Sequence, residues 1–274
     1  MPSVTIRFYE ELNDFLPADR RKLPLTVAFP PGCTVKAAIE DRGVPHTEVD
    51  LVLVDGESVD FTHRLRDGDS ISVYPVFESL DITAVTKVRP APLRELRFVA
   101  DVHLGTLAGF LRMFGFDALF AGRRGDEDIA RLSREQSRIV LTRDRGLLKR
   151  RIVTHGCLVR SLAPREQLAE VFARFDLAGP VLSGTGGCSG VFSRCMSCNE
   201  PLVRVEKSAV LPLLPARVAQ AYEKFSQCPG CGKVFWRGTH WERMKDFVEE
   251  VLGVEPVQPL MLCGPCGPLN GIEG

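Results

Sequence analysis

The stretch from Arg97 to Arg151 decides the fold of this 274-residue chain. It reads RFVADVHLGTLAGFLRMFGFDALF over residues 97–120 and GRRGDEDIARLSREQSRIVLTRDRGLLKRR over residues 122–151. Short apolar runs alternate there with helical patterns, in which apolar residues recur at steps of three and four. Strands that alternate with helices at this spacing predict a parallel α/β sheet.

Acidic residues follow the predicted strands of that stretch. Asp101 and Asp144 each come after an apolar run, and Asp126, Glu127 and Asp128 open a helix between them. The carboxyl ends of parallel strands gather along one edge of a sheet, where ligands bind. Carboxylates suit magnesium or manganese. The pattern therefore predicts metal-dependent hydrolysis of phosphodiester bonds, with Asp101, Asp144 and at least one of Asp126, Glu127 and Asp128 as catalytic candidates.

Each acid also has a structural interpretation. Asp101 and Asp144 could cap the helices that follow them. The Asp126, Glu127 and Asp128 cluster could simply complement a helix dipole. Basic residues flank the acids and are expected to contact substrate phosphates or to form a solvated helix face. These candidate substrate-binding residues are Arg123, Arg124, Arg143, Arg145 and Lys149.

Length and composition indicate a multidomain protein, because domains usually hold about 100 to 200 residues. Residues 1–85 carry 8 Lys+Arg against 15 Asp+Glu, a net −7, and residues 94–166 carry 15 against 9, a net +6. This charge asymmetry predicts that the basic domain binds polyanions and that the acidic domain could cover the basic one. The sequence has neither a long apolar run nor a basic-then-apolar leader, so no membrane association and a cytoplasmic location are expected.

The N-terminal 80 residues follow the order ββαβββ, with an Asp55-Gly56 turn typical of a hairpin. This order resembles a β-grasp, ubiquitin-like domain of the MoaD/ThiS kind. Sulfur carriers of that kind act through a free terminal Gly-Gly, but here the last strand ends Pro75-Val76-Phe77-Glu78-Ser79 and the chain continues. A binding or regulatory module with a protein partner is therefore favoured over a sulfur carrier.

Two Cys-x-x-Cys pairs stand 29 residues apart near the C-terminus. Four thiolates from two such turns are the tetrahedral set that structural zinc favours, although a pair of redox-active dithiols is the alternative. The predicted ligands are Cys195, Cys198, Cys228 and Cys231. Trp236 and Trp241 could stack on nucleic-acid bases or pack against the ribbon. A third pair, Cys263 and Cys266, could bind a second ion, act in redox chemistry or have no role.

The quoted stretch together with CPGCGKVFWRGTHWERM resembles the mutator-seven C-terminal RNase family, a PIN-like nuclease fold with an appended zinc ribbon. The matching pieces are FVADVHLGTLAGFLRMFGFD, GDEDIA, LTRDRGLL and the cysteine ribbon. The resemblance implies a ribonuclease acting on single-stranded or structured RNA, with the acidic site at Asp101, Asp126, Asp128 and Asp144. A fourth acid often present further along is not evident. A non-catalytic RNA-binding adaptor with a ubiquitin-like regulatory domain is the alternative.

The expected architecture is a multidomain combination of α/β and α+β folds. It comprises a β-grasp domain (1–80), a linker (81–94), a PIN-like nuclease domain with a central parallel sheet (95–180), a zinc ribbon (190–250) and a flexible tail (251–274).

Overall fold

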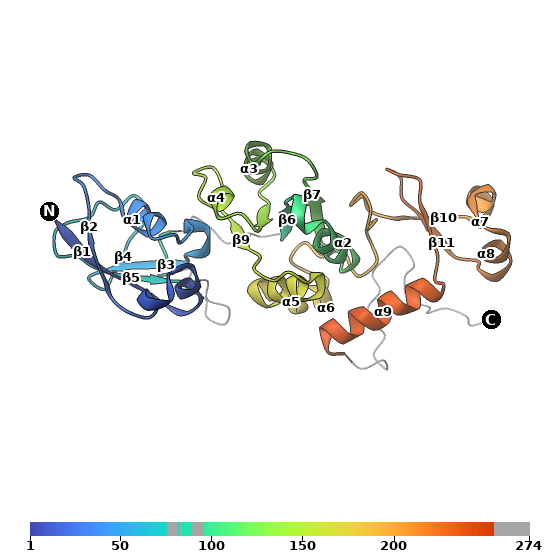
Figure 1. The fold of residues 1–274 in the computed structure, drawn as a ribbon. Helices are drawn as coiled ribbons and strands as arrows, with labels where there is room; N and C mark the ends of the chain where they lie inside the picture. Colours follow the sequence, from blue (N-terminus) through green and yellow to red (C-terminus); the bar gives the residue numbers. More distant parts are fainter. Residues whose placement is uncertain (76–81, 83, 89–95, 255–274) are drawn as a thin grey trace. The chain divides into compact units, whose positions relative to one another are not determined.

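The computed structural model describes residues 1–75, 82, 84–88 and 96–254 (Figure 1). Contacts divide the chain into two compact units, one of residues 1–93 and 123–160 and the other of residues 94–122 and 161–274. Each unit is described by itself. Most of the predicted tail and linker, and with the tail Cys263 and Cys266, lie outside the described residues. Within those residues, no helix has the length and apolar character needed to cross a membrane.

The first unit begins with a five-stranded sheet in the order β2-β1-β5-β3-β4. β1 and β5 are parallel, and the other neighbours are antiparallel. Helix α1 lies across this sheet (Figure 1). The strands are β1 (Ser3–Phe8), β2 (Leu25–Ala28), β3 (Leu51–Val54), β4 (Glu57–Ser58) and β5 (Ser70–Tyr74). The helical segments are η1 (Glu10–Phe15), η2 (Ala18–Arg20), α1 (Val35–Asp41) and η3 (His46–Glu48).

Local signals in the sequence explain two features of this β-grasp fold. The Thr34 hydroxyl accepts a hydrogen bond from the Ala37 amide at 3.3 Å and caps α1. Asp55 and Gly56 both have positive φ, 50° and 86°, in the turn between β3 and β4. Two residues of positive φ match the twist of a two-residue hairpin, so the predicted turn is confirmed.

The first unit continues with alternating helices and strands. These are α3 (Asp126–Glu135), β8 (Ile139–Thr142), α4 (Arg145–Leu148) and β9 (Gly156–Leu158). β8 pairs with β9 in parallel, and all four residues of β8 are buried. A strand buried on both faces is typical of a parallel sheet covered by helices.

The second unit contains a parallel pair of its own, β6 (Arg97–Ala100) with β7 (Asp117–Phe120). Gly115 has φ 96°, and a Cβ there would lie 2.3 Å from the Gly190 carbonyl oxygen. Glycine is therefore required at this turn, both for backbone conformation and for space. The helical segments are η4 (Val102–Leu104), α2 (Gly105–Met113), α5 (Pro164–Phe175) and α6 (Ala178–Ser183).

The C-terminal part of the second unit is a small antiparallel sheet in the order β10-β11-β12. The short helix α8 lies between the two cysteine pairs and ends where the backbone becomes extended at Tyr222, before β11. The elements are β10 (Val203–Val205), α7 (Lys207–Val210), η5 (Leu211–Leu213), α8 (Ala216–Ala221), β11 (Phe225–Gln227), β12 (Val234–Phe235) and α9 (Thr239–Leu252).

Candidate functional site

Asp101 and Asp144 occupy equivalent places in the fold. Asp101 follows β6 directly and caps η4, its Oδ1 accepting a hydrogen bond from the His103 amide at 2.9 Å. Asp144 lies two residues beyond β8 and caps α4, its Oδ1 accepting from the Gly146 amide at 2.7 Å. Asp101 is buried, with 5% of its surface exposed, whereas Asp144 is exposed. Both caps considered from the sequence are therefore present, and each carboxylate sits beyond the carboxyl end of a strand.

Asp126 and Asp128 lie in the first turn of α3. An Asp126 oxygen is 3.7 Å from the Arg150 guanidinium, and an Asp128 oxygen is 2.5 Å from that of Arg131. All four side chains are about half exposed, so these ion pairs add little to stability. The negative charge at the helix start also complements the dipole. Their assignment to a catalytic site remains a prediction.

The basic residues predicted to hold substrate fall into two groups. Arg123, Arg124 and Arg143 are exposed. Arg145, which is also exposed, and Lys149, which is partly buried, contact the β-grasp part of the same unit. The Arg145 guanidinium lies over the ring of Phe15, 5.2 Å from its centroid, and Lys149 Nζ donates to the Glu40 carbonyl at 2.7 Å.

The contact between the β-grasp part and the nuclease elements continues along β9. Glu48, which is 3% exposed, accepts a hydrogen bond from the Leu158 amide at 2.7 Å. The two ring nitrogens of His46 lie 2.7 Å from a Glu40 oxygen and 2.8 Å from the Val153 carbonyl oxygen. Buried polar partners at this boundary fix one docking arrangement, because leaving any of them unpaired would be costly.

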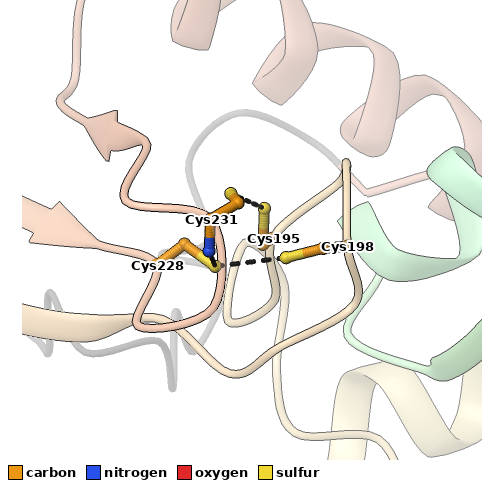
Figure 2. Close-up of side chains that lie close together, drawn as sticks. All are labelled: Cys195, Cys198, Cys228 and Cys231. Atoms are coloured by element: carbon orange, nitrogen blue, oxygen red, sulfur yellow. Dashed lines mark hydrogen bonds between the residues drawn. The ribbon is translucent and has the colours of Figure 1, made fainter.

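The four predicted zinc ligands converge in the second unit. Their side chains come from two loops and point toward one another (Figure 2). Their sulfur atoms all lie within 4.8 Å of each other, with Cys195 to Cys231 at 3.6 Å and Cys198 to Cys228 at 3.2 Å. Sulfurs bonded to one tetrahedral zinc at about 2.3 Å would be about 3.8 Å apart, and a disulfide would need about 2.05 Å. The geometry therefore fits a shared metal ion and not a disulfide.

The thiols influence one another's proton affinity. Burial raises the pKa of Cys195. A hydrogen bond from the Glu200 amide lowers the pKa of Cys198, but desolvation and the neighbouring thiols raise it overall to about 12. The pKa of Cys231 falls to about 7, chiefly because the Lys233 amide donates to it. Cys231 is thus the thiol that ionises most readily near neutral pH, and a bound cation would favour the thiolate form of all four.

Family models match nearly all of the described chain. The model of the Mut7-C RNAse domain matches residues 96–248, which include both β6–β7 and β8–β9 and all four clustered cysteines. This chain belongs to the Mut7-C RNAse family. A second model, Mut7-C ubiquitin, matches residues 1–81 and covers the five-stranded sheet. The family indicates a nuclease-type function, and the four cysteines can hold a structural metal such as zinc.

Comparison with individual proteins adds little to the family match. A solved structure, a putative molybdopterin converting factor, subunit 1, from Pyrococcus furiosus, is 17% identical with a TM-score of 0.23. It covers 28% of this chain and 100% of its own length. None of the curated proteins matches the chain. The fold of this Mut7-C protein is therefore described from its own strands and helices and not from a similar structure.

Two residues that the sequence did not single out join the cysteine loops of this Mut7-C protein to its sheet. Arg112, buried in α2, donates to the carbonyls of Ala118, Met196 and Ser197 at 2.7–3.0 Å. Asn199 accepts from the Ala118 amide at 3.0 Å and donates to Asp117 at 2.7 Å. The loop that carries Cys195 and Cys198 is thereby fixed to α2 and β7. Neither residue has a motif that would reveal contacts more than 80 residues away.

Proposed function

We propose that this protein is a metal-dependent ribonuclease in which Asp101 and Asp144, with Asp126 or Asp128, form the acidic site. The observation that carries the proposal is that Asp101 and Asp144 each follow a strand of a parallel pair and begin the next helical segment. Ligand sites in such sheets lie beyond the carboxyl ends of the strands. The family match supports a nuclease-type activity for the chain, and its location at these strand ends is our proposal.

The donor chemistry of the four acids fits magnesium or manganese, which prefer carboxylate oxygen and retain bound water. A cation held there would supply a water molecule of lowered pKa and would offset charge on the phosphodiester. The carboxylates would orient that cation. The exposed Arg123, Arg124 and Arg143 would hold the substrate backbone through its phosphates, without reading sequence.

The β-grasp domain has a regulatory role in this proposal. Arg145 and Lys149, which would otherwise extend the phosphate-binding surface, contact Phe15 and Glu40. Residues 1–85, which include this domain, carry a net charge of −7, so the domain is negatively charged, as a polyanion is. It would therefore restrict RNA access while docked, and a protein partner that binds it would release that restriction.

The direct test is cleavage of single-stranded RNA by the full chain with magnesium, with manganese and with neither. We expect cleavage only with a divalent cation, and its loss in Asp101→Asn and Asp144→Asn. Asp60→Asn is the matched control, because Asp60 also caps a turn through Thr62 but lies in the β-grasp domain. Cleavage by both site variants at the wild-type rate would overturn the site. RNA binding without cleavage under every metal condition would favour the adaptor instead.

A further inference from the structure

A groove of about 700 Å³ lies beside the cysteine loops in the second unit. We call it the ribbon groove. Its walls come from α8, from β11 and β12, and from the start of α9. Five aromatic side chains line it: Phe192, Tyr222, Phe235, Trp236 and Trp241. The groove is thus an aromatic-walled cavity distinct from the acidic residues of the proposed ribonuclease site.

The two tryptophans are only partly buried, so their rings are accessible from the groove. The Trp241 ring packs against that of Phe192 at 5.5 Å, and the Arg237 guanidinium lies 5.1 Å from its centroid. Gly238 gives Trp236 its space, because a Cβ at this position would lie 2.9 Å from Trp236 Nε1. The rings are therefore held in place before any ligand arrives.

The charge of the groove decides which ligand it suits. Arg194, Arg217, Arg237 and His240 line it, and no Asp or Glu is among the described residues of its wall. Aromatic faces beside arginines are the combination by which proteins bind single-stranded nucleic acid, since every base can stack and every phosphate needs a cation. An apolar peptide would use the rings but would make no use of the arginines beside them.

We propose that the ribbon groove binds an unpaired nucleotide of single-stranded RNA. Its base stacks on Trp241, and the adjoining phosphates lie at Arg217 and Arg237. The choice of RNA rests on the proposed function, whereas the stacking site rests on the groove itself. Bound there, the strand would be anchored by a contact that does not depend on the catalytic cation.

Intrinsic fluorescence tests the proposal directly, because the chain contains two tryptophans and both line the groove. The full chain carrying Asp144→Asn, with no added divalent cation, is titrated with a short oligoadenylate. We expect saturable quenching. An abasic strand of the same length and charge should bind at least about tenfold more weakly and quench little.

Variants assign the site. Trp241→Ala should weaken binding of oligoadenylate about tenfold or more, whereas Trp241→Phe should largely retain it. Arg217→Ala should weaken binding and reduce its salt dependence. Leu213→Ala is the control, because Leu213 is exposed and outside the groove wall. Zinc content and circular dichroism check that each variant is folded.

Three outcomes would overturn the proposal. The first is wild-type affinity in folded Trp241→Ala. The second is equal affinity for the abasic strand and for oligoadenylate, which would show that the groove binds phosphates through charge and not bases through stacking. The third is quenching by an apolar peptide but not by RNA. Metal-dependent cleavage with no effect of Trp241→Ala on binding would contradict this inference alone, and stacking without cleavage would contradict the ribonuclease alone.

Discussion

The guanidinium of Arg145 lies over the ring of Phe15, 5.2 Å from its centroid. Arg145 is the residue after Asp144, and Phe15 belongs to the β-grasp domain. Arg160 reaches the same ring at 4.9 Å and pairs with Asp14 at 3.1 Å. One aromatic ring of the acidic domain thus engages two cations of the nuclease elements. Such cation–π contacts are worth about 0.5–2 kcal/mol each, so together with the hydrogen bonds along β9 they can hold the docked state without making it permanent.

Asp14→Lys should loosen this docking and raise RNA affinity. The change replaces attraction to Arg160 with repulsion, and exposed pairs of this kind are worth up to about 1 kcal/mol, so we expect about a two- to fivefold gain at low salt. The gain should shrink as salt screens the charges. Fluorescence anisotropy with labelled single-stranded RNA measures it.

The matched control is Glu57→Lys, which makes the same charge change at an exposed position of β4. It should raise affinity less than Asp14→Lys. Adding Arg160→Asp to Asp14→Lys should restore pairing and reverse the gain. Equal effects of the two lysine variants would mean that net charge alone governs binding, and the covering role of the β-grasp domain would be rejected.

Glu48→Ala should destabilise the docked state through a single lost acceptor. The Leu158 amide would be left buried without the carboxylate that now accepts from it at 2.7 Å, at a cost of about 1–3 kcal/mol. Urea unfolding and hydrogen exchange at the Leu158 amide measure the change. Glu57→Ala, at an exposed position of β4 in the β-grasp domain, should leave both unaltered. Unchanged exchange at Leu158 in Glu48→Ala would show that the docking is not maintained in solution.

The protein should hold about one zinc ion, and losing it should disturb more than the ribbon. Cys228→Ser should remove the metal, whereas Cys33→Ser, outside the cluster, should not. Because Arg112 and Asn199 tie the first cysteine loop to α2 and β7, hydrogen exchange should also rise at Ala118, whose amide donates to Asn199. Elemental analysis and exchange mass spectrometry measure the two effects. Exchange that rises only within residues 195–235 would show that this link does not transmit the loss.

Local signals predicted most of the elements of this fold. Thr34 marks a helix start, the Asp55-Gly56 turn marks a hairpin, and Gly115 marks a helix end. Each signal acts within a few residues of its own position. The paired cysteines likewise predicted their own cluster, because a Cys-x-x-Cys turn already aims two sulfurs at one point.

Long-range polar contacts could not be predicted in this way. Glu48 binds the Leu158 amide, 110 positions along the chain, and Arg112 binds the Met196 carbonyl, 84 positions along it. In the sequence around each of them, the charged residue looks like any ordinary surface charge. The same reasoning explains why the acids remained ambiguous. A carboxylate after a strand is expected both as a helix cap and as a metal ligand. The two roles differ in one respect, because a metal ligand needs the negative charge of the carboxylate and a helix cap does not.

That difference gives the sharpest test of Asp144. Asparagine caps helices about as well as aspartate, so Asp144→Asn should keep the hydrogen bond to the Gly146 amide and lose the negative charge. Asp144→Ala should lose both, at about 1 kcal/mol of stability. If Asp144 is only a cap, Asn should behave as wild type in every assay. If it holds a cation, Asn should retain wild-type stability in urea but lose metal-dependent RNA cleavage as fully as Ala does. Measuring unfolding and single-turnover cleavage on the same preparations separates the two roles, and an Asn variant that is both stable and fully active would remove Asp144 from the site.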